Sequence, residues 1–88
     1  MTKIYIYCLY DRADALVGVY SSIKAVHRDA MKICNRGFSP VVVKYGDNIT
    51  QTPSLKLLRN LFKGEVDTKV CYMSDANKAT ILKTKLKE

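Results

Sequence analysis

A helix with a single apolar face, expected over residues 22–36, restricts the folds open to this chain more than any other segment. Ser21 or Ser22 precedes it as a helix cap, and Gly37 follows Arg36 at the position where helices commonly end. The apolar side chains inside it recur every three or four residues and share one face; they are Ile23, Val26, Ala30, Ile33 and Cys34. Because such a face is stable only when it is buried, the chain must supply a second layer for it to pack against.

The second layer is expected to be a β-sheet, because several other runs have the composition and the two-residue period of strands. Strands are expected over residues 3–9, 16–20, 40–45 and 65–73, with polar loops over 11–15 and 46–51. A second helix is expected from the cap Thr52 and the first-turn residue Pro53 to Gly64. A third helix is expected from a cap at Ser74 or Asp75 almost to residue 88.

The resulting order, ββαβαβα, predicts one compact α/β domain over residues 1–88. We expect a two-layer (α+β) sandwich in which a four-stranded mixed sheet is covered by helices mainly on one face. The first two strands are expected to form a hairpin, and the later strand–helix–strand connections allow right-handed parallel crossovers. The order of the strands within the sheet is not predicted.

The composition is that of a folded protein of the cytoplasm. The chain is 48% hydrophobic and 26% charged, which is unlike a disordered segment. No apolar run approaches the roughly 20 residues that a membrane-spanning helix needs. The amino terminus also lacks the pattern of a secretory signal. We therefore expect a cytoplasmic protein without a membrane partner.

The sequence contains few residues of the types that bind metals or perform catalysis. Cys8, Cys34 and Cys71 have no metal-type spacing and fall in apolar elements, which favours buried thiols, and His27 is the sole histidine. His27 lies near the edge of the buried face of the first helix, which favours a structural role. No pair of carboxylates suited to acid–base chemistry is apparent. We expect neither an enzyme nor a metal or cofactor site.

Net charge is the largest departure from an average domain, with 15 basic residues against 8 acidic ones and a formal charge of +7. On the two expected helices over 22–36 and 53–64, the cations fall on the outward faces; they are Lys24, Arg28, Lys32, Arg36, Lys56, Arg59 and Lys63. The third expected helix adds further outward lysines, including Lys83. An ordinary solvated surface is one interpretation. A row of like charges at four-residue spacing repels along a helix, however, and suits a phosphate backbone. We predict that the protein binds RNA mainly through contacts to the phosphate backbone of the RNA, with only weak sequence specificity.

Tyrosines form a second group of candidate residues. If Ile4, Ile6 and Cys8 face the helices, then Tyr5 and Tyr7 lie on the uncovered face of the sheet. Tyr20 and Lys69 have the matching parity and complete this expected face, which we name by its residues Tyr5, Tyr7, Tyr20 and Lys69. Three interpretations remain open for it: a homodimer interface, which we favour, a platform for stacking RNA bases, or simple half-burial.

The run Val17-Gly18-Val19-Tyr20-Ser21-Ser22, which leads from a strand into a helix, resembles a pattern in small accessory proteins of tailed bacteriophages. The size, the basic charge and the lack of catalytic groups are also similar to those of phage counter-defence proteins, including the toxin-inhibitory factors of coliphages. This resemblance implies an antitoxin-like inhibitor in the host cytoplasm, with RNA and a host endoribonuclease toxin as partners. It assigns no binding residue. The alternative is a protein-binding inhibitor whose basic helices dock on an acidic host protein without nucleic acid.

Overall fold

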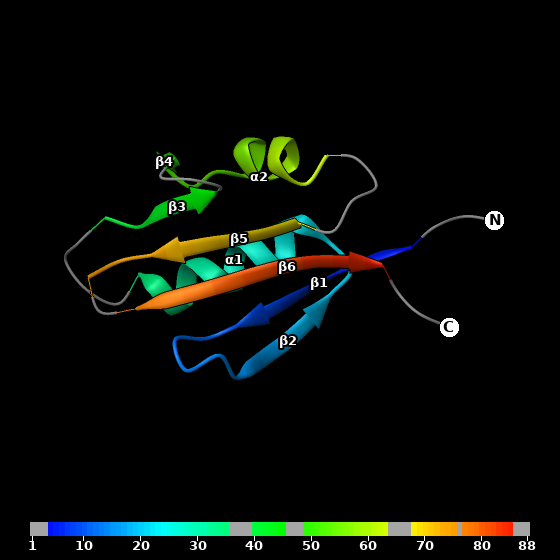
Figure 1. The fold of residues 1–88 in the computed structure, drawn as a ribbon, viewed down its shortest axis with the longest axis horizontal. Coiled ribbons are helices and arrows are strands. Elements are labelled where there is room, and N and C mark those ends of the chain that lie inside the picture. The colour runs from blue at the N-terminus through cyan, green and yellow to red at the C-terminus, as the bar shows by residue number, and fades with distance from the viewer. Residues whose placement is uncertain (1–3, 36–39, 46–48, 64–67, 76, 86–88) are drawn as a thin grey trace.

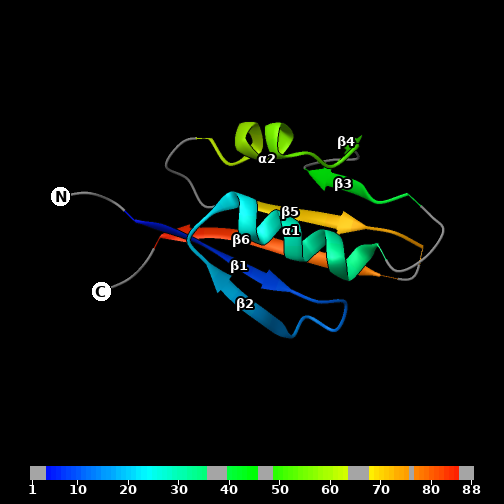
Figure 2. The ribbon, with the colours of Figure 1, turned by 180° about the vertical axis from the view of Figure 1, so that it is seen from behind.

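The computed structural model describes residues 4–35, 40–45, 49–63, 68–75 and 77–85. The elements follow one another as β1 (Tyr5–Tyr10), β2 (Leu16–Tyr20), α1 (Ile23–Cys34), β3 (Val42–Tyr45), β4 (Ile49–Gln51), α2 (Leu55–Leu61), β5 (Thr68–Met73) and β6 (Lys78–Lys85). Figure 1 shows the sheet from its open side, with α1 behind it, and Figure 2 shows α1 from the other side, lying over the sheet and running roughly along its strands.

The strands form one sheet in the order β2-β1-β6-β5-β3-β4, and every neighbouring pair is antiparallel. Five strands make up its body, and the three-residue β4 extends one edge. The expected four-stranded mixed sheet and the order ββαβαβα are therefore wrong. The observed order is ββαββαββ, an α+β fold whose described strands include no parallel pair. Part of the expected loop over 46–51 is the strand β4, which pairs with β3.

The segment 78–85 is a central strand of the sheet and not the third helix expected there. β6 lies between β1 and β5; its residues 80–85 pair with β1 and its residues 78–83 pair with β5. Ala79, Ile81 and Lys83 alternate onto the helix-covered face, while Thr80 and Leu82 face the open side. Lysine, alanine and leucine are good helix formers, but this preference amounts to less than about 1 kcal/mol per residue, so pairing with strands on both flanks outweighs it.

Serine caps set the starts of both helices. The Ser22 hydroxyl accepts a hydrogen bond from the backbone N–H of Ala25 at 3.1 Å, as expected of a cap at Ser21 or Ser22. In α2 the cap is Ser54, whose hydroxyl accepts from the N–H of Leu57 at 3.0 Å, and not Thr52. Pro53 therefore precedes the cap. Both helices end earlier than expected, α1 at Cys34 with Asn35 as its C-cap and α2 at Leu61 with Phe62 as its C-cap. Gly37 and Gly64 themselves lie outside the described residues.

The core lies between α1 and the sheet. Val26, Ala30 and Cys34 of α1 are fully buried, and Ile23 and Ile33 pack at its margin, which confirms the expected inward stripe. The sheet meets this stripe with buried side chains from its central strands, among them Leu9, Val70, Tyr72 and Ile81. Leu58 and Phe62 anchor α2 to the same core. Both helices therefore turn their remaining residues to solvent on one side of the molecule.

Candidate nucleic-acid interface

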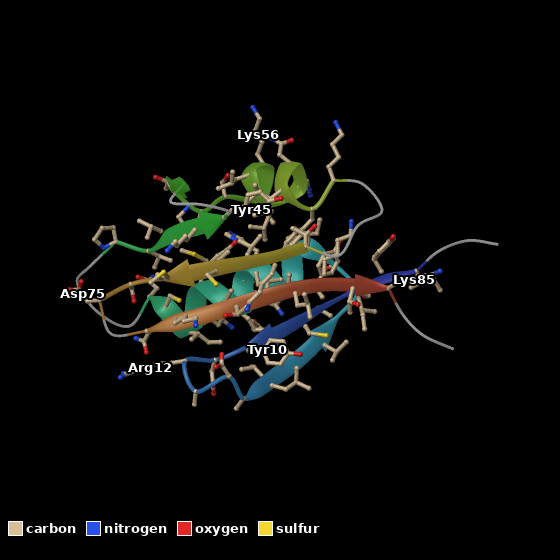
Figure 3. All side chains as sticks on the ribbon, in the orientation of Figure 1. Tyr10, Arg12, Tyr45, Lys56, Asp75 and Lys85 are labelled. Carbon is tan, nitrogen blue, oxygen red and sulfur yellow. The ribbon has the colours of Figure 1, made fainter. Side chains whose placement is uncertain are left out.

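Six of the seven cations expected to bind RNA lie exposed on the two helices. Lys24, Arg28 and Lys32 project from α1, while Lys56, Arg59 and Lys63 project from α2 and the residues that end it. We call these six residues the basic helix surface. The seventh, Arg36, lies outside the described residues. α1 and α2 contact each other, so the two sets of cations lie on neighbouring elements. Figure 3 shows Lys56 pointing away from the sheet.

The burial pattern of each helix explains why its cations are exposed. On α1 the buried positions Val26 and Ala30 lie on the face opposite Arg28, because successive residues rotate by about 100° around a helix. On α2 the buried Leu58 and Phe62 fix one face against the core, so Arg59 stays outside. The basic helix surface therefore follows directly from the two apolar stripes.

Asp29, the acid of α1, is held by two neighbours. The Tyr20 hydroxyl donates to Asp29 Oδ2 at 2.6 Å, and Arg28 Nε donates to Oδ1 at 3.1 Å. The hydrogen bond from Tyr20, followed by that from Arg28, lowers the pKa of the Asp29 carboxyl below its ordinary value. The same bond raises the pKa of Tyr20. Asp29 is therefore ionised at neutral pH and offsets part of the charge of Arg28.

Lys24 and Lys32 flank this pair on α1 without forming an ion pair to any described acid. The other acids among the described residues lie outside the helices. Asp11 and Asp14 are in the β1–β2 turn, and Asp75 follows β5 in the β5–β6 turn. Among the described residues, α1 and α2 therefore carry a single acid, Asp29. The strongest attraction for a polyanion on the helix side therefore comes from the lysines on either side of Arg28 and from α2.

His27 joins α1 to the sheet. His27 Nδ1 and the Tyr72 hydroxyl are 2.6 Å apart, and the two rings meet edge to face with centroids 5.7 Å apart. Burial lowers the pKa of His27 and raises that of Tyr72. Nearby, Cys34 Sγ donates to the Tyr72 carbonyl oxygen at 3.5 Å, and burial raises the pKa of the thiol. These contacts fasten α1 to β5, which is the structural role expected of His27.

The face expected to carry Tyr5, Tyr7, Tyr20 and Lys69 does not exist as one surface. Tyr7 is 8% exposed, and its ring packs against Phe62 with centroids 5.3 Å apart on the helix-covered side. Tyr20 reaches Asp29 of α1 on that same side. The register also places Tyr5 with Tyr7, two residues along the same strand. The parity assigned to β1 was therefore wrong.

Lys69 is exposed on the opposite, open face of the sheet, where Tyr10 also lies (Figure 3). Tyr10 could not be chosen from the sequence, because every position of β1 is apolar or aromatic and the alternation has no polar face. The signal that decides the parity is the full burial of Leu9 against α1, and it requires the tertiary structure.

Lys83 was expected on the solvent side of a third helix, but it is buried. Its side chain is 4% exposed, and Nζ donates to the carbonyl oxygen of Phe62, the C-cap residue of α2, at 2.5 Å. The ammonium also lies 4.5 Å from the centroid of the Tyr5 ring. A cation beside the carbonyl end of a helix is favourable. Lys83 therefore ties β6 to α2 and is not available to a phosphate.

Comparison with protein-family models, with curated proteins and with solved structures gives no significant match. Within the described ranges, no helix is long and apolar enough to cross a membrane. No group of three or more histidine, cysteine, aspartate or glutamate side chains in those same ranges is arranged to hold a metal ion. The interpretation of the site therefore depends on its geometry and charge.

Proposed function

We propose that this protein binds RNA through phosphate contacts made by the basic helix surface. The observation that carries the proposal is the exposure of six cations on two contacting helices, where the one acid, Asp29, is engaged by Tyr20 and Arg28. Each phosphate that such a cation neutralises releases counterions from the nucleic acid, so affinity grows with the number of contacts. The protein acts by occupying its partner and not by catalysis.

The proposed binding reads the backbone and not the bases. Lysine and arginine side chains on the outer faces of two helices reach phosphates along a strand, and such contacts carry no sequence information. The basic helix surface offers no described exposed aromatic side chain for base stacking, since Tyr7 and Tyr20 are engaged with Phe62 and Asp29. Affinity is therefore expected to be similar for unrelated single-stranded RNAs.

The resemblance to phage counter-defence proteins suggests the biological role that this RNA binding would serve. In it, the RNA-bound protein inhibits a host endoribonuclease toxin. Co-expression with such a toxin is the corresponding assay, and substitution of the basic helix surface should abolish any protection. If protection survives in variants that no longer bind RNA, the protein docks directly on an acidic host protein instead.

The decisive experiment measures RNA affinity by fluorescence anisotropy at several salt concentrations. The test variant is Lys24→Glu with Lys32→Glu, since neither lysine pairs with a described acid, whereas Arg28 also holds Asp29. The matched control is Lys44→Glu with Lys69→Glu, which makes the same change of charge with two exposed lysines of β3 and β5 on the open face. The test variant should lose affinity on every RNA and lose salt dependence, by a slope of about 0.7 per phosphate contact removed.

The control variant should keep the salt slope of the wild type, because it removes no phosphate contact. Equal loss of affinity and of slope in both variants would show that only the net charge matters. Absence of measurable binding by the wild type at low salt would overturn the proposal.

A further inference from the structure

A hollow on the open face of the sheet combines side chains of several different kinds. It has a volume of about 270 Å³ and is lined by Tyr10, Asp14, Lys69, Thr80 and Leu82. The register places Tyr10, Thr80 and Leu82 on the open face, away from α1. Figure 3 shows the Tyr10 ring on this side of the sheet. An aromatic ring, a carboxylate, an ammonium group and a hydroxyl therefore surround one small space.

Thr80 forms the floor of the hollow. It is only 4% exposed, between its neighbours Tyr10 on β1 and Cys71 on β5. Within the described residues, its hydroxyl contacts the Cys71 sulfur at 3.8 Å, and a thiol is a weak hydrogen-bond partner. A buried hydroxyl with so weak a partner can form a stronger hydrogen bond with a ligand that sits above it.

Asp14 and Lys69 carry opposite charges on opposite sides of the hollow. Asp14 lies in the β1–β2 turn, whereas Lys69 is on β5, and β6 separates β5 from β1. No ion pair joins the two side chains within the described part of the chain. Lys44 on β3, the next strand after β5, is a second exposed cation beyond Lys69. The hollow is therefore acidic at one end and basic at the other.

The β1–β2 turn holds Asp14 in a defined position. Its backbone has a φ of 60°, and its N–H donates to the carbonyl oxygen of Asp11 at 3.0 Å. The Asp11 carboxylate accepts from the N–H groups of Ala13 at 2.9 Å and Ala15 at 3.0 Å. Asparagine adopts a positive φ as readily as aspartate does. Asp14→Asn therefore removes the charge of this side chain and keeps the turn.

We propose that the hollow binds a free guanine mononucleotide, with the base on Tyr10, the N–H edge of the base at Asp14 and the phosphate at Lys69. A carboxylate only accepts hydrogen bonds, and guanine presents two adjacent donors to it, N1–H and the 2-amino group. The other RNA bases present no such pair of adjacent donors. Stacking on tyrosine is favourable for every base, so selectivity comes from Asp14. This inference does not rest on RNA binding, because α1 and the hollow lie on opposite sides of the sheet (Figures 1 and 2).

The separation of the two charges favours a nucleotide over a free amino acid. Tyr10 on β1 and Lys69 on β5 are two strand spacings apart, about 10 Å. The ammonium and carboxylate groups of an amino acid are attached to one carbon atom, so they are too close together to reach both ends of the hollow. In a nucleotide, the base edge and the phosphate are at opposite ends. The net charge of +7 also attracts the phosphate.

The open face offers a stacking position to one base. Among the described residues, the other tyrosines and the phenylalanine lie on the helix-covered side; they are Tyr5, Tyr7, Tyr20, Tyr45, Phe62 and Tyr72. A strand of several unpaired bases would therefore stack no more bases here than a single nucleotide does. For this reason the proposal names the free mononucleotide.

NMR titration of isotope-labelled protein with GMP, AMP and inosine monophosphate tests the proposal. GMP should shift the resonances of Tyr10, Thr80 and Leu82 with a Kd of roughly 0.1–1 mM, since the hollow is shallow. It should bind at least about tenfold more tightly than AMP, which lacks the paired donors. Inosine monophosphate, which lacks the 2-amino group, should lie between them. Equal affinity for GMP and AMP, or no shift of these resonances at about 10 mM GMP, would overturn the proposal.

Asp14→Asn should weaken GMP binding by about tenfold and should strengthen binding of xanthosine monophosphate, in which a carbonyl that can accept from the new amide replaces the 2-amino group. Asp75→Asn is the matched control, because it makes the same change of charge at an exposed position of the β5–β6 turn. It should leave GMP affinity unchanged. Both variants raise the net positive charge, so a general attraction for phosphate would strengthen binding in both. Equal effects of the two variants would overturn the proposal.

Two further comparisons separate this site from the basic helix surface. Lys24→Glu with Lys32→Glu should lower RNA affinity and keep the preference for GMP over AMP, whereas Asp14→Asn should keep its affinity for a guanine-free RNA. Lys69→Ala should reduce the preference for GMP over guanosine severalfold, because it removes the phosphate contact. Displacement of GMP by a guanine-containing RNA from the variant with both glutamates would assign the hollow to RNA and overturn the free mononucleotide as its ligand.

Discussion

The two faces of the sheet differ in whether helices cover them. The helix-covered face is closed by α1 and α2, and its polar groups have partners: Lys83 with Phe62, Tyr20 with Asp29, and Tyr72 with His27. The open face keeps an uncharged apolar half and a lysine half with no helix over either. Adjacent side chains of one strand therefore lie on opposite faces, one covered by a helix and the other open. This contrast can be tested by substituting neighbouring residues.

The largest effect is expected for Ile81→Ala against its neighbour Leu82→Ala. Ile81 is fully buried under α1, so its truncation leaves a cavity and should lower the free energy of unfolding by about 2–5 kcal/mol. Leu82 faces the open side and is only partly buried, so its truncation should cost about 1 kcal/mol. Urea denaturation at low protein concentration measures both without self-association. Similar losses for the two variants would contradict the strand assigned to β6, because a strand places neighbours on opposite faces.

The next largest effect concerns two lysines, one on each face. Lys83→Ala removes the donor of the Phe62 carbonyl and should lower the free energy of unfolding by about 1–3 kcal/mol. Lys69→Ala, at an exposed position of the open face, should change it by less than about 0.5 kcal/mol. The same denaturation experiment compares them. Equal effects would indicate that Lys83 is solvated and does not tie β6 to α2.

A smaller effect should appear in the dependence of stability on pH. Burial lowers the pKa of His27 from its ordinary value of 6.5, so the unfolded chain takes up a proton first as the pH falls. Stability is therefore complete above about pH 6.5 and is lost as the pH falls through the lower pKa of the folded state. Thermal melting of the wild type and of His27→Asn between pH 7.5 and 5 measures this contribution. The variant should lose less stability over that range, and parallel losses would show that His27 titrates as it does in the unfolded chain.

The smallest effect is expected at the contact between β2 and α1. Tyr20→Phe removes the hydroxyl that donates to Asp29 and should raise the pKa of this carboxyl toward its ordinary value, although Arg28 still lowers it. NMR titration of the Asp29 side chain in wild type and variant measures the shift. An unchanged pKa would mean that Arg28 alone holds the carboxylate and that Tyr20 faces solvent.

Several parts of the fold could be predicted from the sequence because local chemistry determines them. The start of α1 at Ser22 and its inward stripe follow from a capping side chain and from the helical spacing of apolar residues. The basic helix surface was predictable for the same reason, because cations at helix positions outside the apolar stripe are exposed to solvent. Its use in RNA binding stays a prediction.

Two features were decided only by tertiary structure. The segment 78–85 contains residues that suit a helix, yet it is a strand because β1 and β5 both pair with it. The faces of β1 were also ambiguous, because all its side chains are apolar or aromatic and neither face is marked by polarity.

The sequence alone was enough to place the start of α1, its buried face and the cations that its packing leaves in water, because a helix needs only its own spacing and its cap to define its faces. The end of α1, expected at Arg36, is at Cys34. The orientation of Tyr7 toward Phe62, with Tyr10 on the other face, and the central place of β6 in the sheet depend on packing between distant segments. The physical reason is that strands gain their hydrogen bonds and their buried face from segments distant in the chain, so their state depends on partners that local pattern does not specify.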